Sequence, residues 1–88
     1  MTTEDLESRR RRAQWRALHR GTKELDLMIG RFAAARLGDM DEKFLARFEA
    51  FLAVSEPQLQ MWLLAPSLEA GCDFADLVGE VRRFNGLG

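Results

Sequence analysis

The spacing of apolar residues limits the possible folds most strongly, because it follows the period of an α-helix through most of the chain. One buried helical face is marked by apolar residues at positions i, i+3, i+4, i+7 and i+8: Leu25, Met28, Ile29, Phe32 and Ala33. Strand-favouring residues are scarce, since valine and isoleucine together number four and tyrosine is absent. The pattern therefore predicts an all-α fold.

Glycine, proline and capping residues divide the chain into five expected helices with short connections. We expect the first over about residues 4–19, with Thr3 as its N-cap and a narrow apolar stripe that leaves its arginines in water. Gly21 interrupts the pattern, and the second helix is expected over about residues 22–37 with Thr22 as a possible N-cap. Because the chain has 88 residues, these helices should form one domain over residues 1–88.

The third helix should supply the aromatic centre of the core. It is expected after Gly38, which ends the preceding helix, and Asp39, which can cap the next one. We expect Phe48, in the middle of its stripe, to be fully buried. The apolar face of this helix comprises the following residues: Phe44, Leu45, Phe48, Phe51 and Leu52.

Two more helices complete the predicted bundle. Residues 55–57 read Ser-Glu-Pro, a cap, an acid and a first-turn proline, and the fourth helix should end before Pro66. After an interruption at residues 71–73, helical spacing returns over residues 74–84 until Asn85 and Gly86 stop it. Residues beyond 84 can fray.

Single positions in these helices carry more specific expectations. Met28 and Met61 have the spacing of core residues, and we assign Trp62 to the core. Gly30, inside the second helix, costs about 1 kcal/mol relative to alanine, so we expect another helix to approach closely there.

The chain lacks the clusters of residues on which common catalytic and metal sites depend. It has one cysteine, Cys72, and one histidine, His19, whereas zinc sites and Ser/His/Asp or Cys/His mechanisms need several converging side chains. Neither common glycine-rich phosphate-binding motif occurs. We therefore expect a binding protein rather than an enzyme, with no catalytic residues and no metal site.

Cysteine usage and the length of apolar runs indicate the compartment. A lone Cys72 cannot form an internal disulfide, which favours a reducing environment. No apolar run approaches the roughly 20 residues that cross a bilayer. Acidic residues among the N-terminal arginines argue against a secretory or mitochondrial signal. We expect a protein of the bacterial cytoplasm, without membrane insertion.

Charge is distributed unevenly along the chain. Residues 1–36 carry nine Lys/Arg and five Asp/Glu, a net charge of +4, whereas residues 37–88 carry four and nine, a net charge of −5. A nucleic-acid-binding module usually has a uniformly basic surface, so this division fits a protein partner with an acidic patch at least as well.

The segment between the first two helices is the strongest candidate for a contact site. It reads His19-Arg20-Gly21-Thr22-Lys23-Glu24, and a glycine there either turns the backbone or lets a partner's backbone come close. Arg20 offers a planar fork of donors for carboxylates. A purely structural alternative is that Gly21 ends a helix and Arg20 pairs with Glu24 to fix the turn.

These residues resemble the RGxxE signature of the SdhE/Sdh5 family, the succinate dehydrogenase assembly or flavinylation factors. Arg20-Gly21-x-x-Glu24 carries the motif, and the likeness continues through residues 30–33, Glu56-Pro57-x-Leu59 and Trp62-Leu63. It becomes weak after Pro66. The family's small helical bundle matches the five helices expected here.

The resemblance implies a non-catalytic chaperone that binds the flavoprotein subunit of succinate dehydrogenase, or of fumarate reductase, and promotes its covalent flavinylation. The attachment of FAD is then autocatalytic in the partner, so no tightly bound cofactor is expected in this chain and FAD belongs to the partner subunit. The resemblance places the following residues in the contact surface: Arg20, Gly21 and Glu24 from the motif, and His19, Thr22 and Lys23 beside it. We add two residues of the preceding basic helix near the motif, Trp15 as an interface anchor and Arg16 next to it.

The basic first helix leaves an alternative open. The run of arginines at residues 9–12 could make the protein a small helical nucleic-acid-binding or regulatory adaptor, or could be a solvated helix face. No aromatic residues interleave this run as RNA stacking requires. We expect no specific binding of DNA or RNA at physiological salt.

Overall fold

The computed structural model describes residues 5–64 and 74–87, and this part of the chain is helical without strands. The prediction of an all-α fold with five α-helices is confirmed. The expectations for Pro66, Cys72 and the interruption at residues 71–73 lie outside the described residues. In chain order, the elements are α1 (Leu6–Leu18), α2 (Lys23–Arg36), the short 3-10 helix η1 (Leu37–Asp39), α3 (Glu42–Leu52), α4 (Glu56–Leu64) and α5 (Ala75–Phe84).

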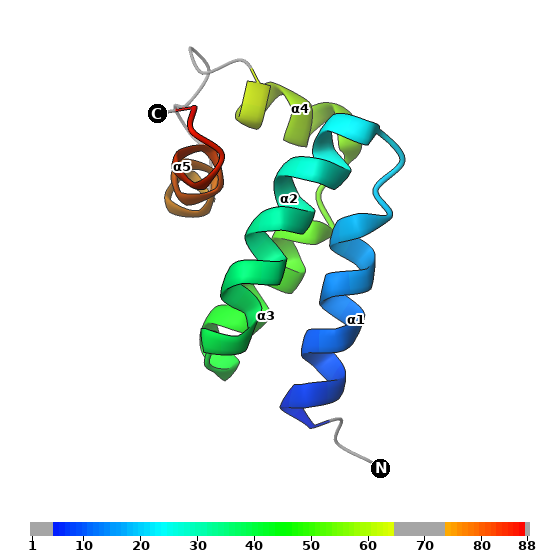
Figure 1. The fold of residues 1–88 in the computed structure, drawn as a ribbon, viewed down its shortest axis with the longest axis vertical. Coiled ribbons are helices and arrows are strands. Elements are labelled where there is room, and N and C mark those ends of the chain that lie inside the picture. The colour runs from blue at the N-terminus through cyan, green and yellow to red at the C-terminus, as the bar shows by residue number, and fades with distance from the viewer. Residues whose placement is uncertain (1–4, 65–73, 88) are drawn as a thin grey trace.

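The five α-helices pack together, and each contributes buried side chains to one hydrophobic core (Figure 1). α1 and α2 lie side by side and run in opposite directions, and α3 also packs on α1. α4 crosses the end of this pair at which the loop between α1 and α2 lies, and α5 packs on α2 on the side away from α1. None of the helices in the described ranges is long and apolar enough to span a membrane.

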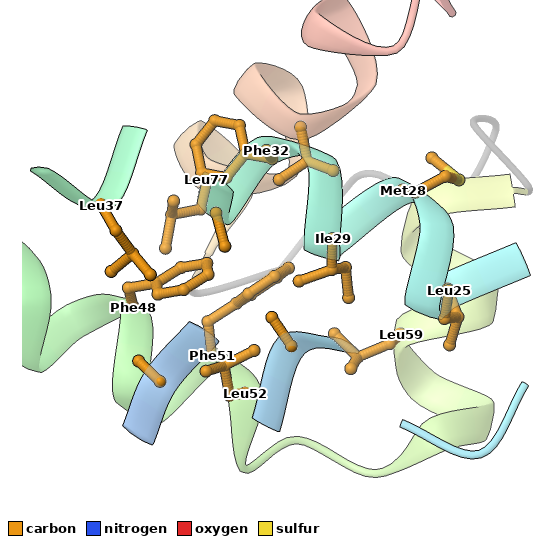
Figure 2. Close-up of a cluster of buried hydrophobic side chains, with 14 of the residues drawn as sticks. Leu25, Met28, Ile29, Phe32, Leu37, Phe48, Phe51, Leu52, Leu59 and Leu77 are labelled. Atoms are coloured by element: carbon orange, nitrogen blue, oxygen red, sulfur yellow. The ribbon is translucent and has the colours of Figure 1, made fainter. Parts of the chain in front are cut away.

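Three phenylalanines from α2 and α3 form the centre of the core, as the stripe of aromatic residues predicts. Phe48 is fully buried, and its ring centroid lies 6.0 Å from that of Phe32 and 6.2 Å from that of Phe51. Figure 2 shows these rings pointing toward apolar side chains of the neighbouring elements. The fully buried aliphatic residues around them include Leu25, Ile29, Leu45, Leu52, Leu59, Leu63, Leu77 and Val81.

Two helix starts differ from the predictions in their capping residues. α1 begins at Leu6 rather than near residue 4, and its N-cap is Asp5 rather than Thr3, because the Asp5 carboxylate accepts a hydrogen bond of 2.9 Å from the Ser8 amide. Asp41 caps α3 in the same way, with 2.8 Å to the Phe44 amide, so the assignment of Asp39 as that cap is wrong. Residues 37–39 instead form η1, which prolongs α2 by a turn.

The close helix approach predicted at Gly30 is confirmed. A Cβ atom at this position would lie 2.5 Å from Cδ2 of Leu18, so Leu18 of α1 packs over the bare backbone of α2. The assignments on α4 are less accurate. Met61 is 44% exposed rather than buried, and Trp62 is half-buried against the edge of the core, because Leu59 and Leu63 occupy the inward face.

The prediction that the arginines of α1 all lie in water is wrong for Arg9 and Arg10. Arg9 donates hydrogen bonds to Glu49 of α3 at 3.2 and 2.7 Å, and Arg10 donates one to the Met40 carbonyl at 2.6 Å. The hydrogen bond from Arg9 lowers the pKa of the Glu49 carboxyl below its ordinary value. These two arginines therefore attach α1 to the segment that leads into α3 and to α3 itself.

Candidate functional site

The predicted contact site is the junction of α1 and α2, which turns within residues 19–22. Gly21 lies at its apex with φ of +112°, a backbone conformation that side chains with a Cβ rarely adopt. Gly21 is exposed, and the nearest atom to a Cβ built there is the Glu56 carboxylate at 3.8 Å. The position therefore requires glycine for its backbone angle, while the space outside it stays open.

Arg20 is held inside the fold by acceptors from a distant part of the chain. Its Nε donates to Oε1 of Glu56 at 3.1 Å, and its two terminal nitrogens donate to the carbonyls of Val54, at 3.0 Å, and Leu52. The Arg20 side chain is 10% exposed. A planar guanidinium fits this triangle of acceptors, because its donors point in fixed and divergent directions. Arg20 thus joins the α1–α2 junction to the end of α3 and the start of α4.

Glu56 is the acceptor that organises the junction. Besides Arg20, it receives a hydrogen bond of 3.3 Å from the Thr22 hydroxyl. Thr22 occupies the N-cap position of α2, as predicted, but its side chain makes no capping hydrogen bond. The amide of Arg20 donates instead to the carboxylate of Asp26 in the first turn of α2. The turn is consequently closed by side chains on both sides of Gly21.

The pairing of Arg20 with Glu24 in the purely structural alternative is wrong, although Gly21 does turn the backbone as that alternative requires. Glu24 is exposed on the first turn of α2 and makes no hydrogen bond or ion pair within the part of the chain that the structure describes. Lys23 is exposed beside it. An acidic residue in this turn interacts favourably with the helix dipole, which is worth a few tenths of a kcal/mol. Glu24 is therefore available for contact with another molecule.

Trp15 and His19 form an exposed aromatic pair next to the junction. Their rings are stacked with centroids 4.1 Å apart, and Nδ1 of His19 lies 2.7 Å from the Trp15 carbonyl oxygen. Trp15 is 61% exposed, although a tryptophan offers a large apolar area for burial. An aromatic side chain displayed in this way is typical of an interface anchor.

An open groove lies between this pair and the loop that joins α3 to α4. The predicted residues Trp15, Arg16, His19 and Arg20 line it on one side. The opposite side was not predicted as part of the site, and its residues are Leu52, Ala53, Val54, Ser55 and Glu56. The Glu56-Pro57 pair in the sequence was the available signal, but it indicated a helix start and not a bond to the junction.

The arrangement offers hydrogen-bond donors, acceptors and apolar surface, and thus suits binding. Gly21, Lys23 and Glu24 lie outside the groove on the exposed side of the same junction. In the described ranges, no group of three or more His, Cys, Asp or Glu residues is placed to hold a metal ion. Of the eight predicted residues, the structure brings Arg20 and Thr22 together through Glu56 and leaves Lys23 and Glu24 facing solvent.

The chain is similar to known proteins along most of its length. A family model described as Sdh5, flavinator of succinate dehydrogenase, matches residues 11–85, a range that contains the whole junction. A protein of Acetobacter pasteurianus named FAD assembly factor SdhE is 42% identical over 60 residues, which cover 68% of this chain and 55% of the relative. The match thus spans about half the length of that relative.

Proposed function

This chain belongs to the Sdh5 family, and on that premise we propose that it is an FAD assembly factor. It binds the flavoprotein subunit of succinate dehydrogenase, or of fumarate reductase, and promotes the covalent attachment of FAD to that subunit. The observation that carries the proposal is the exposed half of the motif, Gly21 and Glu24, displayed within the range that matches the family.

The geometry supports a role in holding the partner. Arg20 and Glu56 fix the junction from inside, so Gly21, Lys23 and Glu24 are presented on a preorganised backbone. Preorganisation lowers the entropy that binding costs. The bare Cα of Gly21 admits a partner's backbone, and the Glu24 carboxylate can accept hydrogen bonds from it.

The proposed factor is a chaperone and not an enzyme. The chemistry of flavin attachment takes place in the partner, and the FAD belongs to the partner subunit. Covalent catalysis needs a nucleophile with an adjacent base, and the chain's one histidine, His19, is instead directed at the Trp15 carbonyl. The proposed compartment is the bacterial cytoplasm, where the single Cys72 would stay reduced.

The alternative of a nucleic-acid-binding adaptor receives less support. It relied on the arginine run of residues 9–12, yet Arg9 and Arg10 bind acceptors within the fold. Two arginines of the run are therefore committed to holding α1 in place, and the basic surface is smaller than the sequence indicates.

Co-expression with the flavoprotein subunit tests the proposal. The subunit is produced alone, with this chain, or with its Glu24→Ala variant, and covalent flavin is scored by its fluorescence in a denaturing gel. We expect strong fluorescence with the unmodified chain and weak fluorescence with Glu24→Ala. Equal fluorescence in all three cultures, at equal amounts of subunit, would contradict the proposed function.

A further inference from the structure

The indole of Trp15 stands at the surface of α1, outside the core of the fold. Trp15 is 61% exposed and lines two open hollows, one along α1 and the other beside Arg20. Its indole N–H has no hydrogen-bond partner in the part of the chain that the structure describes. A side chain in such a place changes rotamer readily unless a neighbouring residue restrains it.

His19 is the neighbour that covers the indole. The two ring planes are inclined by 16°, and the ring centroids lie 4.1 Å apart. Residues four positions apart lie on one face of a helix, and side chains there lean toward its N-terminus, so the imidazole reaches back over Trp15. His19 is itself exposed, so burial in the core does not explain the contact.

A hydrogen bond fixes the imidazole in this place. α1 ends at Leu18, and the amide of His19 donates to the Arg16 carbonyl at 3.3 Å rather than to the Trp15 carbonyl. The last carbonyls of a helix lack the usual backbone donors. Nδ1 of His19 lies 2.7 Å from the Trp15 carbonyl oxygen, which can only accept, so Nδ1 donates. The imidazole is therefore tied to the backbone of the residue whose indole it covers.

We propose that His19 is a positioning residue, which keeps the Trp15 indole in one orientation for contact with the flavoprotein subunit. The inference rests on the proposed function. Binding that must order an exposed side chain costs entropy, and a side chain that is already ordered avoids this cost. His19 acts through Trp15 and needs no contact of its own with the subunit.

The pair is continuous with the junction on which the proposed function depends. His19 directly precedes Arg20 in the chain, and both residues line one groove with Trp15. Arg20 is fixed by Glu56, so the backbone beside the pair is held from inside the fold. The pair thus adds an ordered aromatic surface next to Gly21.

Magnetic relaxation of the free chain tests the positioning itself. The indole N–H of Trp15 is followed in isotope-labelled protein, and Trp62→Phe identifies its signal by removing the other tryptophan. We expect an order parameter near that of rigid backbone, about 0.85, in the unmodified chain and below about 0.6 in His19→Ala. An order parameter that His19→Ala leaves unchanged would overturn the inference.

A double-mutant cycle tests whether His19 acts through Trp15. Calorimetry with the purified flavoprotein subunit compares the unmodified chain, His19→Ala, Trp15→Ala and the double variant. We expect binding to weaken at least about tenfold in Trp15→Ala and about two- to tenfold in His19→Ala. The double variant should match Trp15→Ala within about twofold, because a positioning residue has no effect once the residue it positions is removed. Additive losses would show that His19 contacts the subunit itself and would overturn the inference.

Two control variants separate this role from folding. His19→Phe retains a ring that can stack on the indole, so it should restore most of the affinity and of the indole order that His19→Ala loses. Met61→Ala, at another exposed apolar residue, should bind as the unmodified chain does. Circular dichroism checks that every variant is folded. Equally weak binding by His19→Phe and His19→Ala would overturn the inference.

The remaining outcomes distinguish this inference from the proposed function. If the unmodified chain does not bind the subunit, both fail. If Glu24→Ala binds weakly while Trp15→Ala binds as the unmodified chain does, the inference is overturned and the proposed function stands.

Discussion

The inner and outer halves of the α1–α2 junction contain residues of the same short motif but have opposite surroundings. In the inner half, Arg20 is 10% exposed and donates to Glu56, to the Leu52 carbonyl at the end of α3 and to the Val54 carbonyl in the α3–α4 loop. In the outer half, Lys23 and Glu24 are exposed, and Glu24 has no polar partner in the described part of the chain. Gly21 stands between them, with a positive φ and an open outer side.

The difference teaches that one motif can combine residues that stabilise the fold with residues that are exposed for contact with a partner. Substitutions in either half can abolish partner binding, but for separate reasons. Changes in the inner half should lower the free energy of unfolding, whereas changes in the outer half should not. Measuring stability and binding on the same variants separates the two causes, and the following predictions do so in order of decreasing effect on stability.

Phe48→Ala should cause the largest loss of folding stability among these variants. The side chain is fully buried between Phe32 and Phe51, so its removal should cost about 3 to 5 kcal/mol, a large part of the stability of a small domain. Denaturant titration measures the loss, and partner binding should fall in proportion to the folded fraction. A loss below about 1 kcal/mol would show that the core is not centred on this ring.

Arg20→Ala should be the most destabilising change in the junction. It removes the arginine donor from Oε1 of Glu56 and from the carbonyls of Leu52 and Val54, which should cost about 2 to 3 kcal/mol. Arg20→Lys should restore only part of this, because an ammonium group cannot reach three divergent acceptors. Thermal melts check both variants. Unaltered stability of Arg20→Ala would contradict the conclusion that the inner half of the junction stabilises the fold.

Two substitutions of Gly21 separate the effect of backbone strain on stability from the effect of a large side chain on partner binding. Gly21→Ala and Gly21→Arg should each cost about 1 to 2 kcal/mol, because both place a Cβ at a φ of +112° without a close contact. If the surface outside Gly21 is a contact site, the folded fraction of Gly21→Ala still binds the partner and that of Gly21→Arg does not. Equal binding by both variants, corrected for unfolding, would remove Gly21 from the interface.

The Arg9–Glu49 pair gives a smaller effect that depends on pH. The pKa of Glu49 is lowered in the folded state by its hydrogen bond to Arg9, so the ionised carboxylate stabilises the fold above the ordinary value of 4.5. This contribution is lost as the pH falls through the lowered pKa. Glu49→Gln should therefore cost about 1 kcal/mol at neutral pH, where surface pairs have this magnitude, and progressively less in acid.

Urea titrations at about pH 7 and about pH 3 follow this change. A gap between the unmodified protein and Glu49→Gln that widens toward acid would contradict the assignment of the pair. Partner binding at neutral pH should be unaffected, since Glu49 belongs to neither half of the junction.

The helices and most of the core could be predicted from sequence, because periodicity depends on neighbours within a few positions. Leu25, Ile29 and Phe32 share one face of α2 wherever the helix lies, and Phe48 followed from the same rule. Met61 was misassigned because the apolar spacing of α4 fits more than one face, and only packing against the rest of the core selects Leu59 and Leu63.

The interior of the site could not be predicted, since it depends on pairs far apart in the chain. Arg20 and Glu56 are separated by 36 positions, and the sequence offered Glu24 as a nearer partner. Likewise, the run of residues 9–12 gave no sign of which arginines would meet Glu49 and Met40. The exposed residue Glu24 was identified through the family resemblance, and Trp15 through its place in the basic helix near the motif, because no local rule distinguishes a contact residue from a solvated one.

Glu24→Ala, set beside Glu7→Ala, tests the central claim most directly. Both glutamates are exposed in the first turn of a helix, so both substitutions should change the free energy of unfolding by no more than about 0.5 kcal/mol. Calorimetric titration with the flavoprotein subunit should then show at least tenfold weaker binding for Glu24→Ala and unchanged binding for Glu7→Ala. Equal affinity of the two variants, or a loss of binding by Glu24→Ala that its loss of stability fully explains, would contradict the account.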